Sequence, residues 1–292
     1  AQQAVNFGAA LIATGVHDVV IGGGVEHMGH LPFAAAARTQ EEFGSAFTPE
    51  LLERYALVGQ GLGAEMIAEE WEIGRAELDQ LAVRSHRLAH RATVEGRFER
   101  EIVPMQAAGG ETVVVDQGIR PDTTLETLAA LRPAFKPDGR ITAGNASQIS
   151  DGAAAVLLMS ADRARELGVP ARARIVDQTT VGCDPVKMLE GPIPATAKIL
   201  RRQGMSIDDI DLFEINEAFA PVVAAWARAH HPDMDRVNVN GGAIALGHPL
   251  GSTGARLITT LLHELERADR EIGFVTMCCG GGLGTGTLIQ RV

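Results

Sequence analysis

The sequence AQQAVNFGAALIATGVHDVVIGGG occupies residues 1–24 and contains the pattern that decides the fold. Its apolar residues recur at helical spacing up to Ile12, and Gly15 stands where a helix C-cap is expected. A short apolar strand follows at 18–21, and a glycine triplet at 22–24 is expected to form a turn. We therefore expect a helix, a strand and a glycine turn in this order. The helical pattern already includes Ala1, so the chain is expected to begin inside a helix.

The same order returns in GSTGARLITTLLHELERADREIGFVTMCCGGG, at residues 251–282. A helical pattern covers 251–266, an apolar strand covers 272–277, and a second glycine triplet occupies 280–282. One supersecondary unit used twice explains this self-similarity.

Strand and helix patterns alternate through most of the chain between these two units. The expected strands are 153–159, 173–181, 212–215, 272–277 and 285–290, and the expected helices are 161–167, 195–203, 217–230 and 251–266. Such alternation predicts an α/β fold whose sheet is covered by helices, with ligands at the carboxyl ends of the strands. The alternation lapses between 26 and 145, where two amphipathic helices near 64–71 and 76–93 indicate an inserted lobe.

Composition excludes several classes of protein. The 292 residues are 46% hydrophobic and 22% charged, which fits a globular chain and excludes disordered and collagen-like sequences. The net charge of −11 argues against nucleic acid and anionic membranes as partners. Three cysteines are too few for a disulfide framework, and no apolar run long enough to span a membrane occurs, so we expect a cytoplasmic protein with reduced thiols and no membrane insertion.

The glycine patterns do not fit a nucleotide site. Gly22-x-Gly24 and Gly280-x-Gly282 are followed at the required third position by His27 and Thr285, so neither completes the dinucleotide fingerprint. A dinucleotide-dependent oxidoreductase is therefore disfavoured. The chain also lacks a P-loop and a Gly-x-Ser-x-Gly elbow, which disfavours an NTPase and a serine esterase.

His248 lies in the most unusual local sequence, NVNGGAIALGHPLGSTGAR at 238–256. Glycines surround it, Pro249 fixes the backbone beside it, and a helix is expected to begin just after it. A helix N-terminus lowers the pKa of a nearby imidazole, so a neutral His248 is suited to accept a thiol proton or to donate to an oxyanion. The alternative is a loop histidine satisfied by backbone groups, and the density of glycine favours the functional interpretation.

Cys278 begins the sequence CCGGG, where an apolar strand meets a glycine turn. A free thiol is mostly protonated at neutral pH, so it needs an imidazole or oriented amides to react, and successive glycine N–H groups can bind an anion. The alternative is a buried cysteine acting as a small hydrophobic residue, which we expect for Cys183.

Asn216 and Glu217 stand where a strand is expected to end and a helix to begin. The Asn216 amide could hold a water or a carbonyl in the same pocket as His248 and Cys278. The alternative is that Asn216 is simply a helix N-cap.

Two histidine pairs were considered as metal ligands. They are His27 with His30, and His86 with His90. No third zinc-type ligand lies near either pair, so no metal site is expected. His86 is flanked by arginines and is expected on a solvated helix face.

Three motifs in this order resemble the thiolase family: NEAF at 216–219, GHPLG at 247–251 and CxGGG at 278–282. The resemblance also includes TAGNAS at 142–147 and GPIPA at 191–195, so it extends over essentially the whole chain. It implies a layered α/β fold with two related halves and a loop domain inserted in the first half, which is expected to be truncated here. On this basis 1–26 is a remnant of the N-terminal half, 27–146 the inserted loop domain, 147–168 the last strand and linking helix of that half, and 169–292 the C-terminal half.

The resemblance implies ping-pong acyl transfer through a cysteine acyl-enzyme. Such an enzyme cleaves 3-ketoacyl-CoA with CoA or condenses two acyl-CoA molecules, holds no permanently bound cofactor, and forms a homodimer or homotetramer. His248 matches the residue that activates the nucleophile and lines one oxyanion hole, and Cys278 matches the acid/base cysteine that moves the α-proton. Asn216 matches the residue that holds an oxyanion-hole water, and the Gly280 N–H matches a donor of the second hole.

Five further positions match residues that line the CoA tunnel of the family. They are Arg120 at the nucleotide end, Ser147, Phe135, and Met188 and Phe219 against pantetheine. For Phe135 and Met188 a plain core role is an equally good interpretation.

Two departures from the family pattern bear on activity. The nucleophilic cysteine of the family precedes the position of Ala1, so the chain as printed is expected not to form the acyl-enzyme. Gly59 and Gln60 replace a His-Met pair of short-chain members, which leaves the acyl preference open. The alternative function is a non-catalytic thiolase-like protein that binds acyl-CoA or lipid.

Overall fold

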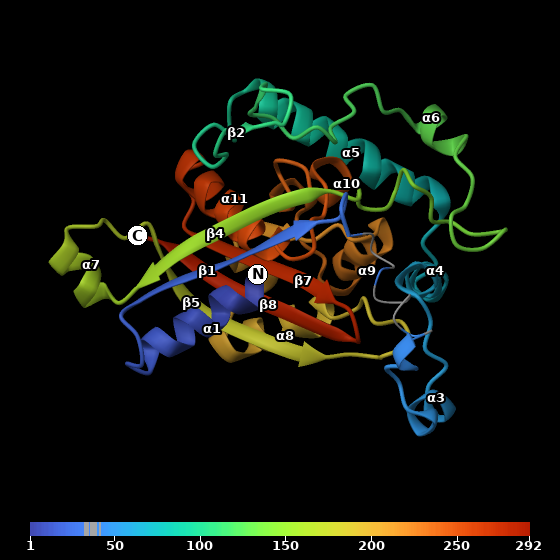
Figure 1. The fold of residues 1–292 in the computed structure, drawn as a ribbon, viewed down its shortest axis with the longest axis horizontal. Coiled ribbons are helices and arrows are strands. Elements are labelled where there is room, and N and C mark those ends of the chain that lie inside the picture. Colours follow the sequence, from blue (N-terminus) through green and yellow to red (C-terminus); the bar gives the residue numbers. More distant parts are fainter. Residues whose placement is uncertain (32–34, 36–39, 41) are drawn as a thin grey trace.

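A four-stranded sheet forms the centre of the C-terminal part of the chain in the computed structural model, which describes residues 1–31, 35, 40 and 42–292 (Figure 1). The strand order is β5 (Ala173–Gly182), β8 (Leu283–Arg291), β7 (Ile272–Cys279) and β6 (Leu212–Ile215). β6 and β7 run parallel, and the other neighbours are antiparallel. Gly281 and Gly282 make the β7–β8 turn with positive φ, as expected for the second glycine triplet.

β1 (Val19–His27) and β4 (Asp151–Met159) form a separate antiparallel pair. The predicted turn at the first glycine triplet is wrong, because residues 22–24 lie inside β1. A Cβ on Gly24 would clash with the Gly251 carbonyl, and one on Gly22 would lie 2.8 Å from the Val5 Cα. These glycines therefore allow a helix and a loop to approach the strand closely.

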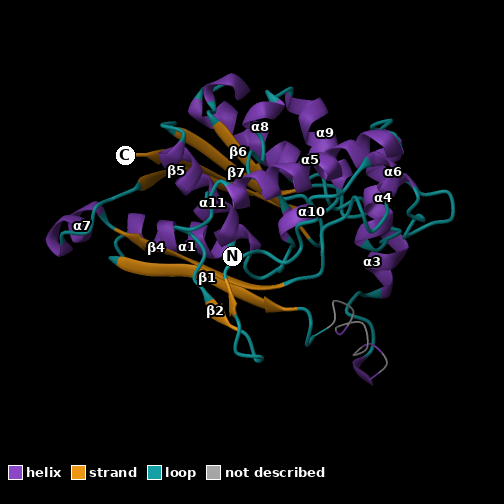
Figure 2. Ribbon diagram, turned by 90° about the horizontal axis from the view of Figure 1, so that it is seen from above, coloured by secondary structure: helices purple, strands orange, loops and turns teal. Residues whose placement is uncertain are grey.

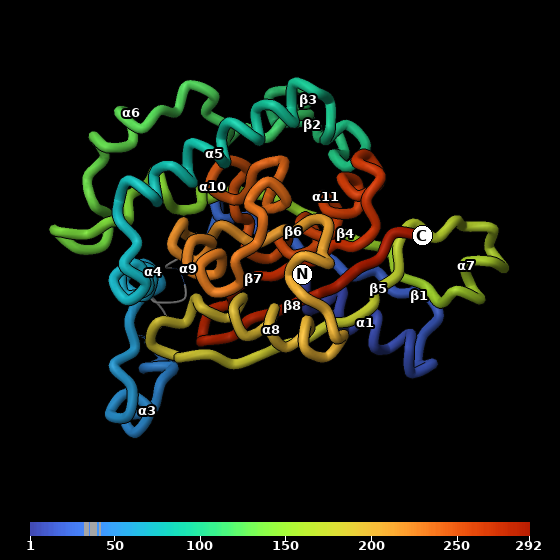
Figure 3. Tube along the Cα trace, turned by 180° about the vertical axis from the view of Figure 1, so that it is seen from behind, coloured from blue at the N-terminus to red at the C-terminus, as the bar shows by residue number. Residues whose placement is uncertain are grey.

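The elements stack in layers, and Figure 2 shows α1 (Gln2–Ala13) and α11 (Thr253–Arg267) between the two sheets. α8 (Pro192–Gln203) and α9 (Ala220–His230) cover the other face of the four-stranded sheet (Figure 3). α11 is amphipathic, and its buried residues, including Leu257, Leu261 and Leu265, pack against Val5 and Val275. The predicted α/β layering is confirmed.

The chain between β1 and β4 forms a lobe at one end of these layers. It contains α3 (Pro49–Arg54), α4 (Gln60–Glu70), α5 (Arg75–Val94), β2 (Met105–Gln106), β3 (Thr112–Val113) and α6 (Leu125–Ala129). Its long helices pack on α9 and on α10 (Ala243–Leu246), and Ile67 and Leu78 join Phe219 and Ala225 in one core cluster. α7 (Ala161–Leu167) connects β4 to the C-terminal sheet. No helix of the described part of the chain is long and apolar enough to cross a bilayer.

Candidate active site

His248 follows α10 and is held by hydrogen bonds at both ring nitrogens. The Thr253 hydroxyl donates to the Pro249 carbonyl at 2.8 Å and lies 2.7 Å from Nδ1 of His248. Both contacts fit the Nδ1-protonated tautomer, in which the hydroxyl accepts the Nδ1–H and gives its own proton to Pro249. Nε2 then carries the lone pair and accepts from Nδ2 of Asn216 at 3.2 Å. The basic nitrogen therefore faces the Asn216 side of the loop.

The surroundings keep His248 neutral. Burial, and secondarily the positive charge of Arg256, lower the pKa of the imidazole to about 4. The predicted helix N-terminus is also adjacent, since α11 begins at Thr253. A neutral imidazole with an unprotonated Nε2 is suited to accept a proton at physiological pH.

Asn216 lies directly after β6 and is fully buried. The alternative prediction of a helix N-cap is wrong, because α9 begins later, with Phe219 at its N-cap. Oδ1 of Asn216 is buried and has no hydrogen-bond partner among the described residues. The amide oxygen is thus available to a donor from a bound group, which fits the expected role of holding a water.

The next residue, Glu217, holds neighbouring segments in place, a role that the sequence did not indicate. Its Oε2 accepts from the Ser85 hydroxyl at 2.6 Å and from the Ile244 N–H at 3.1 Å. Its Oε1 accepts from Nδ2 of Asn238 at 3.1 Å. The hydrogen bonds of this buried carboxylate therefore connect α5 and α10 to the loop that carries Asn216.

Cys278 is the last residue but one of β7 and lies in the same pocket as His248. Burial raises the pKa of its thiol to about 12, so the group stays protonated near neutral pH and is suited to donate a proton. The pocket has a volume of about 260 Å³. It is lined by Ala1, Gln2, Gln3, Gln60, Leu189, Ala218, His248, Leu250, Met277, Cys278, Cys279, Gly280 and Thr285. The sequence-predicted His248, Cys278 and Gly280 thus meet in one cavity.

The residues expected along a CoA tunnel lie in three different surroundings. Met188 and Phe219 belong to the core cluster that contains Cys278, and Phe135 packs edge-on against Phe219 with ring centroids 5.8 Å apart. Ser147 donates its N–H to the Ala218 carbonyl, next to the pocket. Arg120 lies on the exposed surface of the lobe and is not among the residues that line the pocket.

The histidine pairs lie elsewhere. His27 pairs with exposed Asp151 at 2.9 Å and stacks on His30. The prediction for His86 is wrong, because it belongs to the buried stripe of α5 and its Nδ1 accepts the Arg120 N–H. Its pKa falls to about 4, chiefly through burial. Across residues 1–31, 35, 40 and 42–292, no group of three or more His, Cys, Asp or Glu side chains could hold a metal ion.

Buried acidic side chains gather around Arg256, close to the segment that carries Asn216. Glu214, two residues before Asn216, lies 3.6 Å from Nη1 of Arg256, which is too long for a hydrogen bond. Burial raises the pKa of Glu214 to about 8 and that of Glu101 to about 7. The positive charge of Arg256 acts on both carboxyl groups and opposes the rise in their pKa, so one cation faces two acids.

This cluster predicts a pH-dependent stability. The unfolded Glu214 ionises near its ordinary pKa of 4.5, whereas the folded group holds its proton up to about pH 8. Between these values the folded state binds more protons, so its free energy of unfolding falls with rising pH, by up to ~1.4 kcal/mol per pH unit for this group. We expect Glu214→Gln to remove this contribution in urea unfolding at a series of pH values. The exposed Glu53→Gln is the matched control, and a slope unchanged in Glu214→Gln would contradict the prediction.

Comparisons with known proteins identify the family to which the chain is similar. The family models described as "Thiolase, N-terminal domain" and "Thiolase, C-terminal domain" match residues 1–162 and 169–291. The steroid 3-ketoacyl-CoA thiolase FadA6 of Mycobacterium tuberculosis is 46% identical over all of this chain and 72% of its own. The 3-ketoacyl-CoA thiolase of Aeromonas hydrophila is 48% identical over 99% of this chain and 76% of its own. The crystal structure of the Bacillus anthracis acetyl-CoA acetyltransferase superposes with a TM-score of 0.89 at 40% identity, covering 99% of this chain and 76% of that one.

Proposed function

Since the chain belongs to the thiolase family, we propose that it cleaves 3-ketoacyl-CoA with CoA, or condenses acyl-CoA in the reverse direction, through a cysteine acyl-enzyme. One observation carries the proposal. A neutral His248 with an unprotonated Nε2 and a protonated Cys278 lie in the same cavity, beside the Gly280 backbone. A base and an acid with separated pKa values are what the two halves of this reaction need.

We place the nucleophilic cysteine in a Cys-x-Ser segment that ends just before Ala1, outside the printed residues. Ala1 lines the pocket together with His248 and Cys278, so a segment joined to its nitrogen starts at the pocket wall. α1 begins at Gln2, and its N-terminus favours a thiolate. Reading the three residues that precede Ala1 in the natural protein tests this placement directly, since they should read Cys-x-Ser.

In the thiolysis direction the nucleophile gives its proton to Nε2 of His248 and adds to C3 of the 3-ketoacyl-CoA. The C2–C3 bond then breaks, the acyl group stays on the cysteine, and the departing enolate carbon takes the proton of the Cys278 thiol. The Cys278 thiolate then accepts the proton of the incoming CoA, whose sulfur takes the acyl group. The nucleophile recovers its proton from His248, so each group returns to its starting state.

The two oxygens that become negative are stabilised at separate places. We assign Nε2 of His248 and the water held by Asn216 to one oxyanion, and the Gly280 N–H to the other. Each preorganised donor is worth roughly 3–4 kcal/mol in comparable oxyanion holes. Met188 and Phe219 would pack on pantetheine, Arg120 would meet the nucleotide end of CoA, and Phe135 and Ser147 would line the tunnel. The family resemblance also supports a homodimer or homotetramer and a cytoplasmic location.

Product analysis tests the proposal. The natural full-length protein is incubated with a 3-ketoacyl-CoA, with and without CoA, and the products are separated by chromatography. We expect the shortened acyl-CoA only when CoA is present, and acetyl-CoA in the absence of CoA only up to one equivalent per active site. Binding of acyl-CoA in calorimetry without either product would instead favour a non-catalytic acyl-CoA-binding protein.

A further inference from the structure

The last carbonyls of α10 have no helical donor, because the chain leaves the helix at Gly247 and Pro249, which follows His248, has no N–H. The Ala245 carbonyl would normally accept the N–H four residues later, but that residue is Pro249, which has none. The Ile244 carbonyl would accept the N–H of His248, which instead points to the Gln148 carbonyl at 3.1 Å. Two carbonyls are therefore left without main-chain donors in the described part of the chain.

The side chain of Gln148 supplies the missing donor. Its Nε2 donates to the Ile244 carbonyl at 2.7 Å and to the Ala245 carbonyl at 3.2 Å. The same nitrogen donates to the Gly118 carbonyl of the lobe at 2.8 Å. One residue thus accepts the His248 N–H with its backbone and completes α10 with its side chain.

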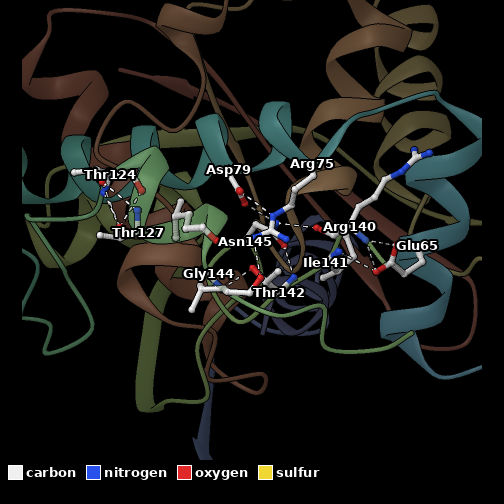
Figure 4. Close-up of polar contacts among 12 residues, drawn as sticks. Glu65, Arg75, Asp79, Thr124, Thr127, Arg140, Ile141, Thr142, Gly144 and Asn145 are labelled. Carbon is white, nitrogen blue, oxygen red and sulfur yellow. Dashed lines mark hydrogen bonds and ion pairs between the residues drawn. The ribbon is translucent and has the colours of Figure 1, made fainter. Parts of the chain in front are cut away.

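The segment that carries Gln148 is itself firmly held. Nδ2 of Asn145 donates to Asp79 of α5 at 2.9 Å, and the Glu65 carboxylate accepts from the Ile141 N–H at 2.8 Å (Figure 4). The Asn145 carbonyl accepts the Ala220 N–H at 2.9 Å, beside the loop of Asn216. Residues 140–148 therefore connect the lobe to both loops of the site.

We infer that Gln148 is a positioning residue for the proposed acyl transfer, holding Nε2 of His248 in register with Asn216 by donating to the end carbonyls of α10, which no main-chain N–H reaches in the described part of the chain. The inference rests on the proposed function. Gln148 does not contact the reacting atoms. Its effect passes through the backbone on both sides of Gly247. Loss of its amide would let the end of α10 move while the pocket wall formed by Cys278 and Gly280 stays in place.

Gln148→Leu in the natural full-length protein tests this inference, because leucine keeps much of the volume and removes both donors. We expect kcat for thiolysis to fall on the order of 10- to 100-fold, the loss typical of a misplaced catalytic group, with KM for the 3-ketoacyl-CoA unchanged. Gln203→Leu is the matched control, since it removes one exposed amide hydrogen bond to Asp177 at the end of α8. Its kcat should stay at the wild-type value, and the two variants should unfold at similar temperatures.

The ¹⁵N spectrum of the His248 imidazole gives a readout that does not need activity. We expect Gln148→Leu to shift these signals and Gln203→Leu to leave them unchanged. An unaltered kcat in Gln148→Leu would overturn the inference. A lower kcat that comes with a higher KM and a lower unfolding temperature would also overturn it. If the wild type does not catalyse thiolysis, the proposed function fails, and the imidazole spectrum alone decides: a shift supports the positioning role and an identical spectrum refutes it.

Discussion

Replacing His248 by alanine should lower kcat for thiolysis by roughly 10²- to 10⁴-fold, the range for loss of a general base. The variant loses the nitrogen that accepts the nucleophile's proton and a donor to one oxyanion. Because Nε2 is oriented by Asn216 and Thr253 holds Nδ1, water in the vacated space would not reproduce the geometry. Steady-state kinetics with a 3-ketoacyl-CoA measures the loss.

His17→Ala is the control for this experiment, since His17 is exposed in the loop after α1. It should keep the wild-type kcat. His248 lies near the core, so thermal unfolding of the variant is measured alongside, and the loss of activity should exceed any loss of folded protein. A folded His248→Ala variant with wild-type turnover would refute the base assignment.

Cys278→Ala should separate two reactions that share the acyl-enzyme. Thiolysis should fall by roughly 10²- to 10⁴-fold, because the enolate carbon then has no acid to protonate it. Exchange of labelled CoA into acetyl-CoA should be retained much better. In that reaction the leaving atom is sulfur, which departs as a stable thiolate with a pKa of about 8.5.

Cys183→Ala is the matched control, because it removes a half-buried thiol that is not among the pocket-lining residues. Both reactions should continue at the wild-type rate in this variant. Equal losses of thiolysis and exchange in Cys278→Ala would contradict the role of proton donor to carbon. His248→Ala, in contrast, should impair both reactions, because both begin with attack by the same nucleophile.

The regular elements could be predicted from the sequence because their patterns are local. β6 and α7 have the predicted bounds, and α11 differs from its expected range by one or two residues at each end. Strands and helices of this kind follow from apolar periodicity, which depends on neighbours within a few residues. The catalytic candidates were also visible, since His248 and Cys278 stand at the joints of such elements.

The two glycine triplets show where local patterns stop being informative. Residues 280–282 form the expected turn, whereas 22–24 continue a strand. The difference arises from Val5 and Gly251, which approach the first triplet from other parts of the chain. A local sequence contains no information on which distant backbone will lie against it.

The start of α9 was placed three residues too early for a similar reason. Phe219 is extended and forms a bridge to Ala146, and the carboxylate of Glu217 is used by Ser85 of the lobe. These contacts with distant residues override the helical preference of the segment. Gln148 was missed although a signal existed, because Pro249 four residues after Ala245 requires a replacement donor without indicating which residue provides it.

Intact-protein and peptide mass spectrometry of the natural full-length protein, after incubation with a 3-ketoacyl-CoA in the absence of CoA, tests the central claim most directly. We predict one added acyl group, on a cysteine other than Cys183, Cys278 and Cys279, that disappears when CoA is supplied. Acetyl-CoA should be released in equal amount. An unmodified protein, or an acyl group on Cys278, would contradict the account.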